Sequence, residues 1–216
     1  MWDFLKSDVS VAALVVLFLV VAVALIHSLR TRRALRSVIE HRYAEISADA
    51  MMSEILRNQE KYRELNREEL EQAGDSQLIE MFSYHLAALA EGQEKDSRQV
   101  ILETQGEKGI VFSVLFTRRQ ILSGRFFDLF LYENADSFLQ KAIYSYKAVG
   151  APRSAKVLVK VRESVKSKYE KKGLDALFRG NFLVAAEDDF KMMDRWENVR
   201  KLCAAYIKKN LDAICD

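Results

Sequence analysis

Few residues of this 216-residue chain stand at the spacings that catalysis or metal binding requires. The three histidines, His27, His41 and His85, are far apart, and no phosphate-binding glycine loop, nucleophile elbow or Cys-x-x-Cys pair is present. Ser-x-Lys pairs begin at Ser145 and Ser154, but residues two apart on a helix point to different faces. We therefore predict no catalytic residue, no metal site and no cofactor.

The two cysteines and the carboxylates leave one alternative open. Cys203 and Cys215 would differ by about 120° in direction on one helix, so we expect two free thiols. An enzyme that acts on a lipid or a nucleotide through an unrecognised site would need clustered carboxylates in a cleft. The candidates for such a cluster are Asp128, Glu133, Asp136 and Asp188.

The strongest charge feature is a basic amphipathic segment from Arg153 to Lys172. The default interpretation is the solvated face of a packed helix. The alternative is contact with anionic lipid or with an acidic partner. Nucleic acid is an unlikely partner, because no exposed aromatic residues are interleaved with the basic ones. The candidate contact residues are Arg153, Lys156, Lys160 and Lys166.

A dense aromatic cluster follows Gly124. Rings in such a cluster are more often core than ligand site, and their burial would stabilise a domain substantially. As an alternative, they line a groove for a partner helix. The candidate partner surface consists of Phe126, Phe127, Phe130, Tyr132 and Asn134.

The elements that position these residues are predicted to be helices. Pro occurs once and Gly eight times, and the net charge is only +2. Such a composition favours an all-α protein and disfavours a generally basic nucleic-acid binder. Apolar spacing and turn residues predict helices at about 75–90, 110–122, 136–149, 152–169, 183–193 and 196–213.

The N-terminal part carries an apolar run, 9–29, that contains no charged residue and is followed by four arginines. Its length of about 21 residues matches a bilayer, and the arginines predict an outer N-terminal tail, 1–8, with the rest of the chain cytoplasmic. We therefore expect a single-pass protein of the bacterial inner membrane. A polar helical connector, 30–72, carries a broken apolar seam that could form a homodimer. A compact domain, 73–216, should follow.

Two stretches of this domain carry a family pattern. SGRFFDLFLYENADSFLQKAIYSYKAVGAPRSAKVL, residues 123–158, places a glycine turn before aromatic residues, then Asn134 and a helix that closes with Val-Gly-Ala at 149–151. The tail has Asp-Asp-Phe at 188–190 and Ala-Tyr-Ile-Lys at 205–208. In both respects the chain resembles the DNA-mimic-protein C-terminal domain family from about Gln77 to Asn210.

The resemblance implies an all-helical fold and no known catalytic motif. The family's turn usually has Asn-Gly-Gly, whereas this chain has Leu122-Ser123-Gly124. Duplex mimicry is not carried over, because it requires phosphate-like carboxylates and basic residues slightly outnumber acidic ones after Gly74. We predict a membrane-tethered, non-enzymatic interaction module for an unknown protein partner. The enzyme and nucleic-acid binding through 153–172 are the alternatives.

Overall fold

The computed structural model describes residues 50–130, 134–172 and 182–215. Contacts divide the chain into two compact units, Met1–Ile55 and Leu56–Asp216. Of the first unit, residues 50–55 are described, and they are helical. All regular structure described in the second unit is also helical, which agrees with the all-α composition.

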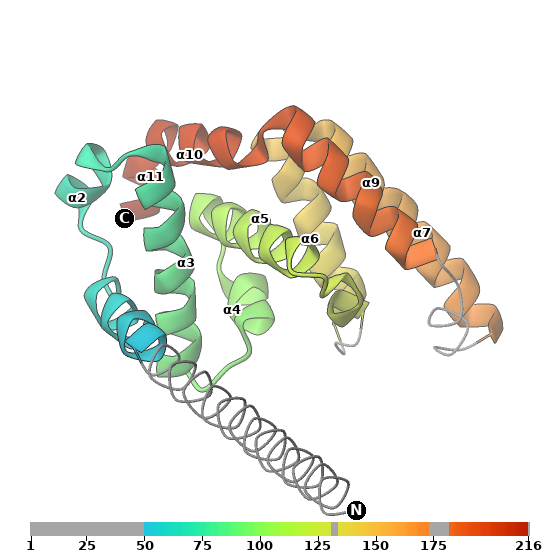
Figure 1. Ribbon diagram of the computed structural model, residues 1–216, viewed down its shortest axis with the longest axis horizontal. Helices are drawn as coiled ribbons and strands as arrows, with labels where there is room; N and C mark the ends of the chain where they lie inside the picture. The colour runs from blue at the N-terminus through green and yellow to red at the C-terminus, as the bar shows by residue number, and fades with distance from the viewer. Residues whose placement is uncertain (1–49, 131–133, 173–181, 216) are drawn as a thin grey trace, which may run out of the picture. The chain divides into compact units, whose positions relative to one another are not determined.

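The second unit is built from helices joined by short turns (Figure 1). Residues 56–61 are helical. They are followed by α2 (Arg67–Gln72), α3 (Asp75–Gly92), α4 (Ser97–Glu103), α5 (Gly106–Leu122), the 3-10 helix η1 (Phe126–Phe130), α6 (Ala135–Ala148), α7 (Pro152–Lys172), α9 (Phe182–Glu197), α10 (Val199–Lys209) and α11 (Leu211–Cys215).

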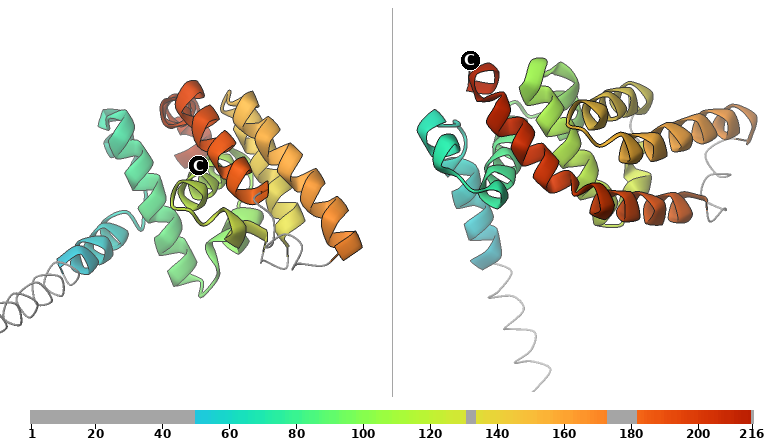
Figure 2. Two further views of the ribbon diagram at one scale, coloured as in Figure 1. Left: turned by 45° about the vertical axis from the view of Figure 1, so that its right-hand side comes forward. Right: turned by 90° about the horizontal axis from the view of Figure 1, so that it is seen from above.

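Helix α5 is the centre of the core. It contacts α3, α4, α6, α9, α10, α11 and η1 (Figures 1 and 2). Because neighbours surround it, α5 buries side chains on more than one face, from Gly109 to Ile121. Phe112 packs edge-on against Phe82 of α3, and Phe116 against Phe138 of α6. Edge-to-face aromatic pairs of this kind add stability beyond that of area burial alone.

Helices α6, α7 and α9 pack beside one another at one end of this unit (Figure 2). The turn from α6 to α7 needs glycine, because Gly150 has φ +88°. The Ala151 N–H donates to the Tyr146 carbonyl at 2.8 Å, which satisfies the end of α6, and Pro152 then starts α7. The predicted helices at 136–149 and 152–169 correspond to α6 and α7.

Other boundaries differ from the predictions for physical reasons. The predicted helix at 196–213 is divided, because Asn198 adopts φ +50° between α9 and α10 and a further break precedes α11. Helix α4 is absent from the predictions. It has only seven residues, too few to show a clear apolar period, and Asp96 caps it by accepting from the Arg98 N–H at 2.8 Å.

The predicted connector helix is not continuous up to Gln72. Residues 50–61 are helical, but the chain then turns before α2. Tyr62 is buried at this turn, and its carbonyl accepts a hydrogen bond from Nδ1 of His85 at 3.0 Å. Burial of the Tyr62 ring, which stacks on Tyr84, holds the turn against α3. The N-terminal part of the predicted connector, 30–49, and the dimer seam that it carries lie outside the described residues.

The membrane-spanning part of the expected fold class has to be corrected. Where the structure describes the chain, no helix is both long enough and apolar enough to cross a bilayer. The longest, α7, has 21 residues, but charged side chains interrupt it at every turn. The single-pass architecture and the inner-membrane localisation are therefore withdrawn. The segment 9–29, on which they rested, lies outside the described residues.

The burial of His85 predicts a dependence of stability on pH. Burial lowers the pKa of His85 below its ordinary value of 6.5, since the charged ring is poorly solvated there. The unfolded chain therefore binds a proton more readily than the folded one, so stability is complete above pH 6.5 and falls as the pH drops below it. We expect a slope of at most about 1.4 kcal/mol per pH unit from this group.

Denaturant unfolding of wild type and His85→Gln between about pH 7.5 and pH 5 measures this contribution. Glutamine keeps an N–H donor for the Tyr62 carbonyl but does not titrate. The variant should lose less stability than wild type on acidification. Equal losses in the two proteins would show that His85 is not responsible.

Candidate functional site

The predicted aromatic surface is largely interior. Phe126 and Phe130 are buried in η1 and contact each other edge-on, whereas Phe127 is half-buried. Asn134 is exposed at the start of α6, and Tyr132 lies outside the described residues. The rings of Phe126 and Phe130 thus form part of the core, the default interpretation of the cluster.

The predicted basic residues lie at the surface. Arg153, Lys156, Lys160 and Lys166 of α7 are exposed. The opposite side of the same helix is buried, with Leu158 and Val161 in the core. The amphipathic arrangement expected for this segment is therefore present, and the partner of its basic side stays a prediction.

Helix α9 exposes apolar side chains that the sequence reasoning missed. Val184, Met192 and Trp196 are 63%, 55% and 61% exposed. Met192 and Trp196 are one turn apart and lie side by side on the helix. Val184, twelve residues before Trp196, points about 120° away from it, and the exposed Asp188 lies between Val184 and Met192. We call Met192 and Trp196, together with Asp188 and Arg195 beside them, the α9 face. The missed signal was a second apolar stripe, on the side of α9 away from Leu183, Ala186 and Phe190, which are buried.

A shallow groove of about 680 Å³ runs between the C-terminal half of α9 and the start of α7. Such a groove is large enough for side chains of a partner. Most of the exposed lining area is apolar, although four of the seven lining residues carry a charge. The lining residues are Arg153, Asp188, Lys191, Met192, Met193, Arg195 and Trp196.

The corner of the groove is held by two interactions between α7 and α9. The guanidinium carbon of Arg153 lies 3.2 Å from the ring centroid of Trp196, a close cation–π contact. The Glu197 carboxylate accepts from the backbone N–H groups of Arg153 and Ser154, at 2.7 and 2.8 Å, and from the Ser154 hydroxyl at 2.6 Å. Glu197 thus caps α7 from another helix, and Arg153 is fixed over Trp196.

A buried ion pair supports α9 from beneath. Arg118 of α5 donates from Nε and Nη2 to the two Asp194 oxygens at 2.8 and 3.0 Å. Asp194 is 4% exposed and Arg118 25% exposed. Phe190 packs edge-on against Tyr146 of α6 on the same buried side. These buried contacts fix the position of α9 and therefore of the α9 face.

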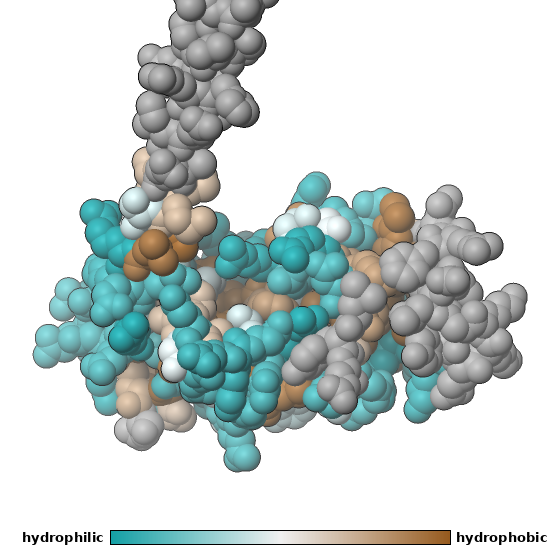
Figure 3. All heavy atoms as spheres, turned by 90° about the horizontal axis from the view of Figure 1, so that it is seen from below, coloured by the Kyte–Doolittle hydropathy of each residue, from teal (hydrophilic) through white to brown (hydrophobic). Residues whose placement is uncertain are grey.

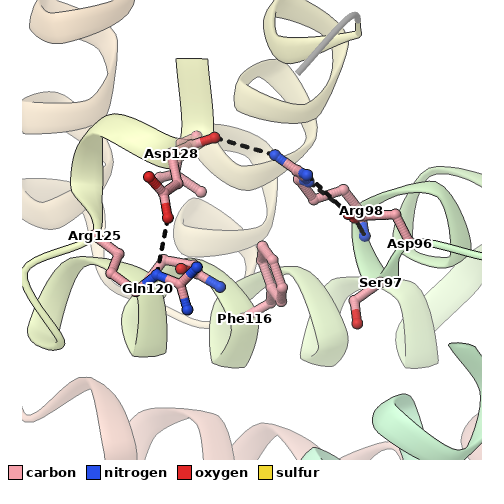
Figure 4. Close-up of a pocket in the computed structure, with 8 residues that line it drawn as sticks. Asp96, Ser97, Arg98, Phe116, Gln120, Arg125 and Asp128 are labelled. Atoms are coloured by element: carbon pink, nitrogen blue, oxygen red, sulfur yellow. Dashed lines mark hydrogen bonds and ion pairs between the residues drawn. The ribbon is translucent and has the colours of Figure 1, made fainter. Parts of the chain in front are cut away.

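A smaller polar cavity, of about 160 Å³, lies between α4, α5 and η1 (Figure 4). Arg98 donates to both Asp96 oxygens at 2.8 and 2.7 Å and to the Asp128 carbonyl at 3.1 Å. Arg125 donates to the Asp128 carboxylate at 2.8 Å. The guanidinium of Arg98 lowers the pKa of Asp96. These charged groups pair with one another, and their hydrogen bonds hold η1 against α4.

Two of the carboxylates that an enzyme would need form ion pairs with arginines. Asp128 pairs with Arg125, and Asp136 with Arg162 at 2.6 Å. Arg162 holds the pKa of Asp136 at about 2, so this carboxyl group is not a proton donor near neutral pH. Asp188 is exposed on α9, and Glu133 lies outside the described residues.

Among the described residues, no group of three His, Cys, Asp or Glu side chains could hold a metal ion. Cys203 and Cys215 are free. Burial raises the pKa of the Cys203 thiol to about 12, so it is not a thiolate at neutral pH.

Comparison with protein families decides what kind of domain carries these features. Residues 106–210 match the family model described as DMP19-like protein. The match covers just under half of the chain, and we refer to this segment as the DMP19-like domain. It begins with the first residue of α5 and ends just after α10, so the DMP19-like domain contains η1, α6, α7 and the α9 face.

The match confirms the resemblance predicted from the aromatic turn and the C-terminal motif. It starts later than expected, since α3 and α4 precede the matched residues. A comparison with curated proteins and with solved structures finds no match. The DMP19-like domain has no function assigned by these comparisons, so its function has to be argued from its surface.

Proposed function

We propose that the DMP19-like domain is a non-enzymatic protein-binding domain that holds a partner protein on the α9 face. The observation that carries the proposal is the exposed pair of Met192 and Trp196 at the groove. Soluble surfaces carry single apolar residues routinely, but neighbouring large apolar residues that line a groove are typical of an interaction site. On the face of the molecule in Figure 3, hydrophilic side chains predominate and apolar colour occurs in small patches between them.

The residue types of the α9 face support the same proposal. Trp and Arg are the residues that most often dominate the binding energy of interfaces, and Met adapts its shape to a partner. Here the Arg153 guanidinium already lies on Trp196, next to Met192 and the groove. The partner is thus a protein segment that inserts an apolar side chain between Met192 and Trp196.

Photocrosslinking in the cells from which the gene comes tests the proposed function. A photoreactive amino acid at Met192 should give a discrete adduct with another protein, whereas one at the exposed Glu91 of α3 should not. The crosslinked protein is then purified and its binding to the full-length chain is measured. No adduct at Met192, or the same adduct at both positions, would contradict the proposal.

Trp196→Ala should weaken binding of that purified partner by about 30-fold or more, because a central Trp contributes about 2 kcal/mol or more to binding. Fluorescence anisotropy of the labelled partner measures the change. Tyr144→Ala is the matched control, since Tyr144 is equally exposed but does not line the groove. If both variants bind like wild type, the α9 face is not the binding surface.

A further inference from the structure

The charges around the α9 face indicate what kind of segment fits it. We propose, on the basis of the proposed function, that the partner segment is an acidic amphipathic helix. Its apolar side would cover Met192 and Trp196, and its carboxylates would meet the basic groups along the groove.

The basic groups outnumber the acidic ones at this site. Three of the four charged residues that line the groove are basic: Arg153, Lys191 and Arg195. Lys191 is paired with Glu187 one turn away, which leaves Arg153 and Arg195 opposed by Asp188. Lys156 and Lys160 extend the positive charge along the exposed side of α7. A partner with carboxylates is therefore attracted and a basic partner is repelled.

The Glu197 carboxylate, at the corner of the groove, is already engaged. Glu197 accepts hydrogen bonds from the first turn of α7, through Arg153 N–H, Ser154 N–H and the Ser154 hydroxyl. The Arg153 side chain extends instead over Trp196. Because its position is fixed before binding, little side-chain entropy is lost when a carboxylate contacts it.

The spacing of Met192 and Trp196 favours a helix as the bound form. They are four residues apart on α9, and rows of this spacing are the ridges that pack into the grooves of another helix. A partner helix of about three to four turns presents apolar side chains toward such a ridge at i, i+4, i+7 and i+11. The groove accepts the ridge of such a helix in the manner of helix-in-groove recognition.

Nucleic acid would also be attracted by the positive charges, but its bases could not stack freely on the Trp196 ring. Single strands bind proteins by stacking bases on exposed rings. The Arg153 guanidinium, 3.2 Å from the ring centroid, covers one face of Trp196. An apolar side chain from a protein can pack at the ring edge beside Met192 without displacing this guanidinium.

Tryptophan fluorescence of the full-length chain tests the proposal. Trp2→Phe leaves Trp196 as the single tryptophan. The probes are synthetic peptides of about 14 residues with Leu, Ile or Phe at the helix spacing above. Their polar positions carry Glu, Gln or Lys. We expect saturable emission shifts with the Glu peptides, at least tenfold weaker binding of the Gln peptides and no binding of the Lys peptides. Binding of the Glu peptides should weaken from roughly 0.05 to 0.5 M salt.

Two variants assign the effect to this surface. Arg153→Gln and Arg195→Gln should each weaken the Glu peptides about fivefold or more, whereas Lys147→Gln, an exposed lysine outside the groove, should not. The proposal is overturned if no Glu peptide shifts the emission, if Gln or Lys peptides bind as well, or if an oligothymidine strand binds more tightly than any peptide. A specific adduct at Met192 together with failure of the Glu peptides would sink this inference and leave the proposed function standing. Binding of the Glu peptides without any adduct at Met192 would contradict the proposed function and leave the preference for acidic helices standing.

Discussion

Replacing Arg118 with methionine is expected to destabilise the protein by about 3 to 5 kcal/mol, because the Asp194 carboxylate would remain buried without a partner. Asp194 is only 4% exposed, and its two oxygens are held by the Arg118 fork. A carboxylate that loses its cation in the interior keeps its desolvation cost without the compensating attraction. Urea unfolding followed by circular dichroism measures the change in the free energy of unfolding.

The two partners of this pair should not be equivalent. Asp194→Asn leaves Arg118, which is 25% exposed and can turn toward water, so its cost should be smaller. The double variant Arg118→Met/Asp194→Leu should recover most of the lost stability, since apolar pairs often replace buried ion pairs without loss. Asp212→Ala breaks the Arg67–Asp212 contact, where Asp212 is 81% exposed, and should cost at most about 1 kcal/mol. Equal effects at Asp194 and Asp212 would contradict this account.

Gly109→Ala should also destabilise the protein, by about 1 to 3 kcal/mol, although alanine is normally the better helix former. A Cβ atom at Gly109 would lie 2.1 Å from the Thr104 carbonyl oxygen. This oxygen is held in place, because the Lys141 ammonium donates to it at 2.5 Å and to the Ile101 carbonyl at 2.6 Å. Relief of the clash therefore requires movement of backbone and loss of these hydrogen bonds.

Gly92→Ala is the matched control for this prediction. Gly92 is also helical, as the last residue of α3, but a Cβ there meets no atom within 4 Å. Alanine at Gly92 should leave stability unchanged or raise it by up to about 1 kcal/mol. Thermal unfolding of both variants gives the comparison, and a neutral Gly109→Ala would show that the approach of α5 to Thr104 is not tight.

The local pattern was sufficient for the elements that are long and periodic. The apolar spacing of Phe138, Leu139, Ile143 and Tyr146 predicted α6, and the Gly150–Pro152 turn predicted the start of α7. In both cases the signal lies within a few residues of the element. Helix α4 was missed because seven residues do not show a period, and its place is decided by Lys141, which is distant in sequence and bonds the Ile101 and Thr104 carbonyls.

The candidate site was predictable only in part. The basic side of α7 followed from its spacing, since charges on one side and apolar residues on the other show in the sequence alone. Burial of Phe126 and Phe130 could not be distinguished from exposure, because an aromatic residue serves a core and an interface equally well. Trp196 was assigned to no surface, and its contact with Arg153 bridges residues that are more than forty positions apart.

The sequence by itself determined that the described chain is helical and where most helices lie, because helix formation depends on propensity and spacing within a few turns. It also carried the motifs of the family that 106–210 matches. Only the tertiary structure decided which apolar stripe of α9 is buried and which faces water. That choice depends on Arg118 and Tyr146, which contact α9 from distant parts of the chain, and on Glu197, through which α9 caps α7. Contacts between distant residues produce no local period in the sequence.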